Sequence, residues 1–402
     1  MALPPKSERG EWLERWCGVK ITSIDLFPVW LQVKKEAWTK DEYVWPSQVP
    51  SVIVRVNTNE GLYGLGEATS QLWYFGETRS HLIESLRILE RQLRGADPTN
   101  IAELHRQMEL TIGGGAPGCR SAVAAIDMAA YDLLGRAEEK PVYELLGGAY
   151  RTHFELLTNL YQKTPEKMAE ACRSCVEQGF RGLKVKVGDV LTQNGWSLAN
   201  LHAEVEKLQA ALEATPDDVY VDADANQGWR SAKTTISVVR RRFDGYSNLG
   251  LEQPLRYFDL DGHRLLRESL GHSIILDESV LSPEMALSIV KAEAADRLDV
   301  KLNRVGGFWN ARKIVAIAEA AALGISIDTS PFGLLGDTAL CHLAATVREA
   351  YPVDAEGHLW FVDEPYVGGI EIQNGLATLP SCPGLGVELD EDALAVMQER
   401  ER

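Results

Sequence analysis

The sequence predicts an α/β protein whose main part is a closed parallel barrel, preceded by a domain of antiparallel strands and helices. Three observations lead to this prediction. From residue 153 to residue 362, eight short β-rich runs alternate with seven amphipathic helical segments. Before them, Val- and Ile-rich runs flank a tight turn. After them, the tail returns to short strands among glycine and proline turns, and we expect it to pack on the first domain.

The first domain begins with an antiparallel meander. Residues 19–33 and 51–56 are rich in Val and Ile, which favour strands. Residues 57–61 form a turn, and 62–68 return as a third strand. The glycines of this third run lie in a strand and do not open a helix, so the pattern does not favour a phosphate-binding loop.

Two helices are expected next. Leucines at helical spacing predict a helix over residues 80–111, and glycines at 113–118 end it. An apolar face predicts a second helix over 121–134. Its acidic residues, Asp127 and Asp132, are interpreted as structural.

The barrel prediction depends on regular alternation of strands and helices. An open doubly wound sheet would show a similar pattern and is the alternative. Eight repeated units favour a closed barrel. The predicted strands are Phe154–Leu160, Gly182–Val187, Val219–Asp224, Leu249–Gln253, Ile274–Asp277, Leu298–Leu302, Ile325–Asp328 and Leu359–Val362.

Composition excludes some classes of function. The formal net charge of −17 argues against a surface for nucleic acid or anionic membrane. The six cysteines are scattered, and Cys172 and Cys175 lie in a helical pattern, so we expect reduced thiols in a cytosolic protein. No apolar leader segment and no run of about 18 apolar residues is present, which predicts a cytoplasmic protein without a membrane span.

The second predicted barrel strand carries two lysines in an apolar run. Lys184 and Lys186 are two residues apart, so both point to the same side of the strand. An unpaired ammonium group there would be costly, and such a pair needs anionic neighbours or a lowered pKa.

The following strands end in acids. Asp224, Glu252 and Asp277 stand at the ends of three successive strands, where barrel enzymes place their functional groups. Oxygen ligands alone suit Mg²⁺ and disfavour zinc. The alternative is that these acids only neutralise the lysines, including Lys301 on the sixth strand.

Lys186 and Lys301 complete a chemical hypothesis. They come from strands on opposite sides of the barrel mouth, so a metal-bound substrate carboxylate would have a base on either face of its α-carbon. Removing the α-proton leaves a dianion that a divalent metal can stabilise. Crowding by Lys184 and the metal is expected to lower the pKa of Lys186.

At this point the chain resembles the enolase superfamily, in its muconate-lactonizing-enzyme-like subgroup, over nearly its whole length. Two outlying pieces also match, at 125–148 and at Pro383–Gly386. The motifs that carry the resemblance are Lys184-Val185-Lys186, Asp224-Ala225-Asn226-Gln227, Leu251-Glu252-Gln253-Pro254, Leu276-Asp277-Glu278-Ser279, and Lys301 followed by Gly306-Gly307.

The resemblance implies a modified TIM barrel, (β/α)7β, under an α+β capping domain formed by the N-terminal part and the C-terminal tail. The corresponding boundaries are 1–150 for the cap, 151–362 for the barrel, and 363–402 for the segment that returns to the cap. It also implies a homo-oligomer, because relatives are often dimers or octamers.

The resemblance also implies roles for the charged residues. Mg²⁺, or Mn²⁺ in its place, would be held by Asp224, Glu252 and Asp277. Lys186 and Lys301 would be the acid/base pair, with Lys184 as a supporting cation. Asp222 and Glu278 could replace Asp224 and Asp277 as ligands on strand geometry alone, but the family motifs favour Asp224 and Asp277.

The reaction is not fixed by the fold. A Lys/Lys pair favours 1,1-proton transfer, and hence a racemase or epimerase of an amino acid or of an N-substituted, including cyclic, derivative. Dehydration of a hydroxylated acid and cycloisomerisation are the alternatives, and a catalytically silent binding protein is the alternative of another class. The substrate would be a small-molecule carboxylate.

Several residues are candidates for substrate contact. Asp328 could pair with a substrate ammonium group, and the aromatic residues of 34–45 and 73–75 could either line the pocket or pack. The candidates are Asn226, Glu278, Asp328, Ser330, Trp45 and Trp73.

Overall fold

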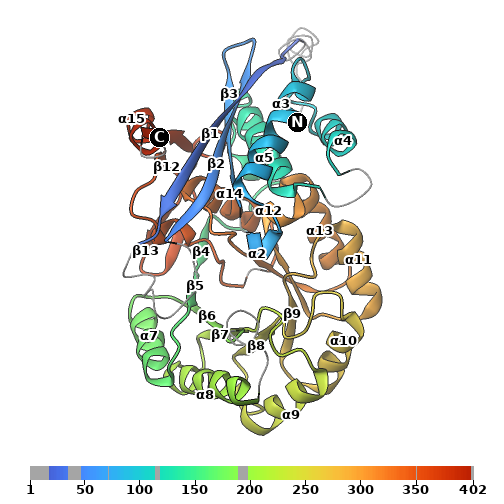
Figure 1. Cartoon of the computed structure of the whole chain (residues 1–402), viewed down its shortest axis with the longest axis vertical. Coiled ribbons are helices and arrows are strands. Elements are labelled where there is room, and N and C mark those ends of the chain that lie inside the picture. The colour runs from blue at the N-terminus through green and yellow to red at the C-terminus, as the bar shows by residue number, and fades with distance from the viewer. Residues whose placement is uncertain are drawn as a thin grey trace, which may run out of the picture.

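The structure, a computed structural model, describes residues 18–34, 47–70, 72–113, 118–188, 198–349 and 351–399. The N-terminal sheet and its helices form the upper part of Figure 1, and a ring of strands and helices forms the lower part. Within the described ranges, no helix is long and apolar enough to cross a membrane.

The upper part is built on a three-stranded antiparallel sheet in the order β1–β2–β3. Its strands are β1 (Ile21–Gln32), β2 (Gln48–Thr58) and β3 (Tyr63–Thr69). The centre of β2, residues 52–54, is fully buried, which suits its β-branched side chains. The predicted meander is confirmed.

Helices α3 (Arg79–Leu93) and α4 (Ile101–Thr111) follow the sheet. The single helix predicted over 80–111 is wrong, because the chain turns between these two. Gly95 adopts a positive φ of 82°, and the Asn100 side chain accepts a hydrogen bond from the first turn of α4.

Helix α5 (Arg120–Ala137) packs directly on β3. A Cβ atom on Gly64 would lie 2.0 Å from the carbonyl oxygen of Ala129. One on Gly66 would lie 1.9 Å from the carbonyl oxygen of Ala125. These glycines therefore permit close contact between strand and helix, and they lie in a strand as predicted.

The lower part is a curled parallel sheet of seven strands, with helices on its outer side (Figure 1). This confirms the predicted barrel fold. The strands are β5 (Leu157–Leu160), β6 (Gly182–Lys186), β7 (Tyr220–Asp224), β8 (Leu249–Glu252), β9 (Ser273–Leu276), β10 (Arg297–Val300) and β11 (Gly324–Ile327). The outer helices are α7 (Pro165–Glu177), α8 (Leu198–Ala214), α9 (Ala232–Arg242), α10 (Leu260–Ser269), α11 (Pro283–Ala292), α13 (Phe308–Ala320) and α14 (Leu334–Ala345).

The gap between β5 and β11 is closed by only two residues. Val353 bridges to Leu156, and Asp354 bridges to Asp328, both in parallel orientation. The predicted eighth strand at Leu359–Val362 is wrong, since a 3-10 helix, η1 (Gly357–Trp360), occupies its first half and Phe361 forms only an isolated bridge, to Val33. A short apolar run does not distinguish a strand from a buried helical turn.

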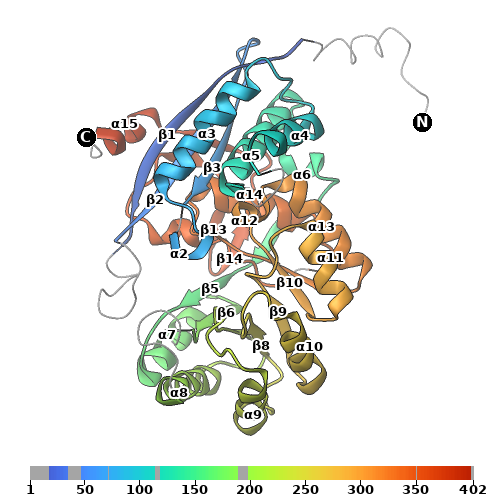
Figure 2. The ribbon, with the colours of Figure 1, turned by 45° about the vertical axis from the view of Figure 1, so that its right-hand side comes forward.

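The C-terminal segment returns to the upper part. It contains β12 (Tyr366–Gly368), β13 (Glu371–Gln373), β14 (Leu376–Thr378), β15 (Val387–Leu389) and α15 (Glu391–Glu399). Helix α15 lies beside β1 (Figure 2), and Arg55 of β2 forms an ion pair of 2.9 Å with Glu391. Strand β14 pairs with β13 on one side and with β4 (His153–Glu155) on the other.

Buried carboxylates tie these parts together. Asp132 of α5 accepts hydrogen bonds from the backbone N–H of Leu65 at 2.8 Å and of Leu385 at 2.7 Å, and from Arg136. Asp127 accepts the N–H of Trp309 at the start of α13. The predicted structural role of both acids is confirmed.

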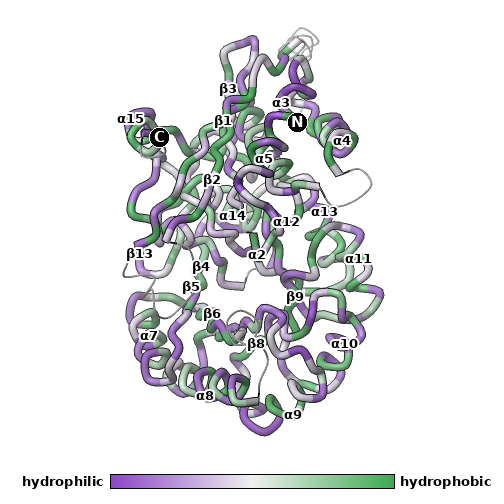
Figure 3. The backbone as a smooth tube through the Cα atoms, viewed as in Figure 1, coloured by the Kyte–Doolittle hydropathy of each residue, from purple (hydrophilic) through white to green (hydrophobic). Residues whose placement is uncertain are grey.

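Glu67 of β3 makes a similar joint with the barrel. It accepts the backbone N–H groups of Gly333 at 3.0 Å and Gly336 at 3.1 Å, at the start of α14, and the hydroxyl of Ser51 at 2.9 Å. Unpaired N–H groups at a helix start favour such an acid. Hydrophobic stretches run along β2, β3 and α5 around this joint (Figure 3).

Candidate active site

The register of the barrel brings the predicted functional residues to one edge of the sheet. Lys186 lies beside Asp224, and Asp224 lies beside Glu252, at the carboxyl ends of β6, β7 and β8. One level deeper, Lys184 lies beside Asp222. Parallel strands of equal register therefore collect these charges at the barrel mouth.

Lys184 is enclosed by acids. Its Nζ atom lies 2.9 Å from Glu252, 2.8 Å from Asp328 and 3.8 Å from Asp354. Burial lowers the pKa of Lys184, but Glu252 and the other acids outweigh it and raise the pKa well above its usual range. This lysine therefore stays charged.

Lys186 contacts Asp224 at 2.5 Å. Burial lowers the pKa of Lys186, but the Asp224 carboxylate outweighs burial, and Lys184 opposes the rise only weakly. The net shift of this pKa is upward, whereas the sequence led us to expect crowding to lower it. The difference arises because Asp224 contacts Lys186 directly.

Lys301 stands among acids from its own strand, β10, and from the ends of the neighbouring strands β9 and β11. It contacts Asp328 closely, and its Nζ atom lies 3.4 Å from Asp299 and 3.7 Å from Asp277. It also donates to the carbonyl oxygen of Thr329 at 3.3 Å. Its side chain is buried, so these charges act on it with little screening by water.

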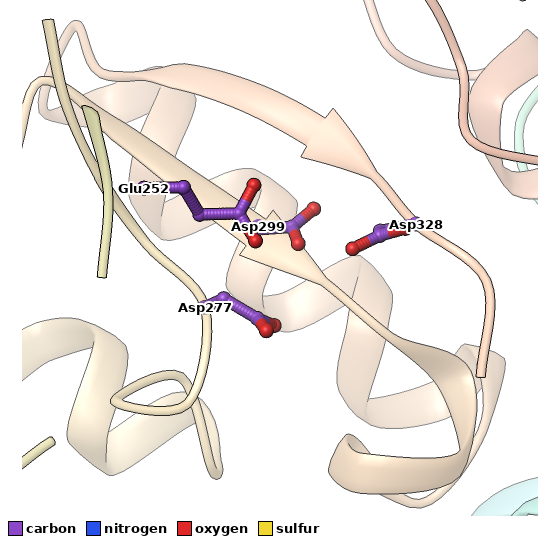
Figure 4. A group of neighbouring side chains, drawn as sticks. All are labelled: Glu252, Asp277, Asp299 and Asp328. Carbon is purple, nitrogen blue, oxygen red and sulfur yellow. The ribbon is translucent and has the colours of Figure 1, made fainter. Parts of the chain in front are cut away.

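Four buried acids gather at this point (Figure 4). Each of Glu252, Asp277, Asp299 and Asp328 has a carboxylate oxygen within 4.8 Å of one from every other. Two of the three predicted metal ligands, Glu252 and Asp277, are in this group. The third, Asp224, lies against Lys186 next to it.

The donor atoms of this group fit a divalent cation. Both carboxylate oxygens of Glu252 and of Asp299, and one of Asp328, have no hydrogen-bond partner within the described residues. The contact between Glu252 and Lys184 is an ion pair by distance, without the angles of a hydrogen bond. Buried oxygens without donors are suited to a hard metal ion.

Asp277 has two partners that sequence reasoning did not identify. Arg304 donates to both of its carboxylate oxygens, and the Tyr74 hydroxyl donates to one of them. Burial raises the pKa of Asp277, but Arg304 and Lys301 outweigh it and hold that pKa below its usual range.

Arg304 and Tyr74 also contact each other. The guanidinium carbon of Arg304 lies 4.8 Å from the centre of the Tyr74 ring. Arg304 follows Lys301 by three residues in the short helix α12 (Leu302–Val305), a spacing that places both on one face. Tyr74 belongs to α2 (Leu72–Phe75), so the upper part reaches the barrel mouth here.

Glu278 lies near Asp277 and Asp224. It accepts hydrogen bonds of 3.4 Å from the side chains of Asn226 and Gln227. Burial, with Asp277 and Asp224, raises the pKa of Glu278 to about 8. Asn226 also donates from its backbone to Asp224 at 2.9 Å.

The backbone after β7 and β8 is strained. Asn226, Gln227 and Gln253 have φ values of 39°, 69° and 37°, in the left-handed region that side chains other than glycine rarely adopt. Such outliers cluster at functional sites, because surrounding contacts hold them in place. Gln253, for example, accepts the backbone N–H of Asp277 at 3.0 Å.

The other predicted substrate contacts are placed as follows. Asp328 contacts Lys184 and Lys301. The Ser330 hydroxyl is buried without a hydrogen-bond partner among the described residues. Trp45 lies outside the described residues, as does the side chain of Trp73.

Two family models match the chain. One, described as "Mandelate racemase / muconate lactonizing enzyme, N-terminal domain", matches residues 45–147. The other, "Enolase C-terminal domain-like", matches residues 167–393. Together they cover the upper part and the barrel.

Individual proteins of known structure are also similar to this chain over most of its length. The N-succinyl-L-Arg/Lys racemase of Bacillus cereus is 30% identical over 94% of this chain and 97% of its own length, and its crystal structure has a TM-score of 0.84. The dipeptide epimerase of Enterococcus faecalis, in complex with Mg and L-Leu-L-Tyr, covers 92% of this chain and 99% of its own, at 28% identity and a TM-score of 0.81.

A relative with another activity is also similar. The cis-3-hydroxy-L-proline dehydratase of Roseibium aggregatum is 28% identical over 92% of this chain and 96% of its own length. Motifs, barrel geometry and family models thus agree over most of the sequence. The chain belongs to the mandelate racemase/muconate lactonizing enzyme family of the enolase superfamily.

Proposed function

We propose that this protein is a metal-dependent racemase or epimerase that removes and returns the proton α to the carboxylate of an amino acid or an N-substituted, including cyclic, amino-acid derivative. The observation that carries the proposal is the pair Lys186 and Lys301. They stand on β6 and directly after β10, with the acid-bearing strands β7, β8 and β9 between them.

Asp224, Glu252 and Asp277 are proposed as the ligands of Mg²⁺, or of Mn²⁺ in its place. Asp299 and Asp328 lie in the same acid group, and their negative charges are proposed to balance the positive charges of Lys184 and Lys301. When bound, the metal supplies positive charge that stabilises the enolate of the substrate carboxylate.

The lysines have different tasks. Lys186 and Lys301 are proposed to act as acid and base on opposite faces of the substrate. Lys184, which is held charged by Glu252 and Asp328, is proposed as a fixed cation near the developing negative charge. A homo-oligomeric state and a cytoplasmic location stay predictions.

Dehydration is the second candidate, because the Roseibium relative is a dehydratase. It requires one base and a general acid for the leaving hydroxyl group, and either lysine could supply each role. The two candidates differ in their product: proton transfer keeps the carbon skeleton and dehydration creates an alkene.

The test is proton NMR of the purified protein with Mg²⁺ in D₂O. The panel contains amino acids, N-acyl and N-methyl amino acids, dipeptides and hydroxy acids. Loss of the α-proton signal with an unchanged skeleton is expected. An alkene or a ring as product would contradict the racemase proposal and support the alternatives.

Variants assign the roles. Lys186→Ala and Lys301→Ala are each expected to slow α-proton loss from one enantiomer at least about 100-fold. The matched control is Lys207→Ala, which removes another buried lysine, paired at 2.7 Å with Glu204 in helix α8. This control should leave the rate within about twofold of the unaltered protein.

A further inference from the structure

Each proposed acid/base lysine faces a tyrosine ring at nearly the same distance. Lys186 Nζ lies 5.8 Å from the centre of the Tyr161 ring. Lys301 Nζ lies 5.9 Å from the centre of the Tyr74 ring. An ammonium group within about 6 Å of a ring centre is attracted by the negative face of the ring.

The two tyrosines belong to different parts of the molecule. Tyr161 directly follows β5 of the barrel, and its ring packs edge-on against Trp360 at 6.3 Å. The indole N–H of Trp360 donates to Glu356 at 3.0 Å. Trp360 and Glu356 belong to the barrel part of the chain, and the backbone carbonyl of Trp360 accepts the N–H of Lys34 from the upper part at 2.8 Å.

Tyr74 comes from the upper part. Its hydroxyl donates to Asp277, and its ring is covered by Arg304. The strand before it is fastened at Thr69, whose hydroxyl donates to the carbonyl oxygen of Ser330 at 2.5 Å and accepts from Asn303 at 2.9 Å. Tyr74 therefore reaches the mouth on a segment that is tied to the barrel.

On the basis of the function proposed above, we infer that Tyr161 and Tyr74 are positioning residues, each for one lysine and therefore for one face of the substrate. Tyr161 orients the ammonium head of Lys186, so a residue of the barrel positions the lysine of that face. Tyr74 orients Lys301, so the upper part of the molecule sets the other face. Each ring acts through its lysine and needs no contact with the substrate.

The consequence is an enantiomer-selective defect. The initial rate of α-proton loss in D₂O is measured for each enantiomer of a substrate that the unaltered protein converts, and Lys186→Ala and Lys301→Ala identify which lysine takes which proton. Tyr161→Leu is expected to slow the Lys186-dependent rate about tenfold and the other less than about twofold. Tyr74→Leu is expected to do the reverse.

Conservative variants separate the ring from general packing. Tyr161→Phe keeps the ring and should restore the Lys186-dependent rate to within about twofold. Tyr74→Phe should restore part of the Lys301-dependent rate, because the hydrogen bond to Asp277 is still lost. Tyr351→Leu is the matched control, since it removes a tyrosine ring that faces Arg297 and not one of the two proposed acid/base lysines.

Several results would overturn the inference. Equal slowing of both enantiomers by Tyr161→Leu and by Tyr74→Leu would do so. A selective defect in Tyr351→Leu, or Phe variants as slow as the Leu variants, would also overturn it. If the unaltered protein removes no α-proton from any compound of the panel, the proposed function itself fails and the inference falls with it. The two failures are therefore distinguishable.

Discussion

Buried carboxylates occur in two regions of this molecule and have opposite surroundings. Within the upper part Asp132, and at its junction with the barrel Glu67, accept backbone N–H groups from other segments. At the barrel mouth, neither oxygen of Glu252 or of Asp299 accepts a hydrogen bond within the described residues. All four side chains are at most 1% exposed.

The difference teaches how to tell a structural acid from a functional one. A buried carboxylate with N–H partners holds segments of the fold together through satisfied lone pairs, although burial still raises the pKa of Glu67 and of Asp132. A buried carboxylate crowded by other acids and lacking N–H partners destabilises the fold and persists because a ligand needs it. Burial alone does not separate the two classes.

The largest expected effect comes from a mouth acid. Glu252→Gln should lower the rate of α-proton loss at least about 100-fold, because a charge at the proposed metal site is removed. The same change relieves repulsion among the acids but also removes a charge 2.9 Å from Lys184, so the midpoint of thermal unfolding should change less than in Asp132→Asn. NMR rates and thermal unfolding without added metal measure both, and a marked loss of stability would contradict the comparison.

The reverse result is expected within the upper part. Asp132→Asn replaces one acceptor oxygen with an N–H₂ group, which would face the N–H donor of either Leu65 or Leu385. The free energy of unfolding should fall by about 3 kcal/mol, while the rate per folded molecule stays within about twofold. Urea unfolding together with the NMR assay tests this; unchanged stability would remove the distinction between the regions.

Metal addition sharpens the comparison. A cation that binds only the folded state stabilises it by about 2.7 kcal/mol at a concentration 100 times its dissociation constant. Mg²⁺ added after chelation should therefore raise the unfolding midpoint of the unaltered protein and of Asp132→Asn. Glu252→Gln should show little or no rise. An equal rise in all three proteins would place the metal elsewhere.

The smallest expected effect concerns pH. Burial raises the pKa of Glu67 to about 7, although its hydrogen bonds from Gly333, Ser51 and Gly336 oppose the rise. Because the pKa is higher in the folded than in the unfolded state, the folded state binds the proton more tightly. The stability from this group is therefore full below the unfolded pKa and is lost as pH rises through about 7.

Glu67→Gln tests that dependence. The loss of unfolding free energy between pH 5 and pH 8 should be smaller in the variant, by at most about 3 kcal/mol. Asp132→Asn is the matched control and should keep the pH dependence that Glu67 contributes. Identical pH profiles of Glu67→Gln and the unaltered protein would show that Glu67 does not titrate in this range.

The sequence allowed prediction of the features that depend on local pattern. Alternating strands and helices predicted the barrel, and the two-residue spacing of Lys184 and Lys186 predicted their common direction. Strand-end positions brought Glu252 and Asp277 together as expected. Asp299 could have been added to the predicted acid group, because it precedes Lys301 by two residues and so lies on the same face of the strand.

Other features depend on tertiary contacts that no local pattern contains. In the sequence Tyr74 is one member of an aromatic cluster, and only the structure shows that its hydroxyl donates to Asp277. Asp224 has several charged neighbours, and only the folded structure shows that Lys186 is the one in direct contact. The eighth strand was misplaced because two residues, Val353 and Asp354, close the ring without a strand-like pattern.

That short closure gives the barrel a seam. Adjacent strands elsewhere pair over two to five residues, whereas each side of the seam has a single bridge. The seam is held mainly by the backbone hydrogen bonds of Leu157 with Val353, of Val353 with Glu155 and of Asp354 with Ile327. Partial unfolding begins where the fewest bonds must break. Local unfolding of the barrel should therefore begin at the seam. The backbone amides of the seam should be the least protected from hydrogen exchange in the sheet, and Asp354, which lies 3.8 Å from Lys184, should be the first residue of the site exposed to water.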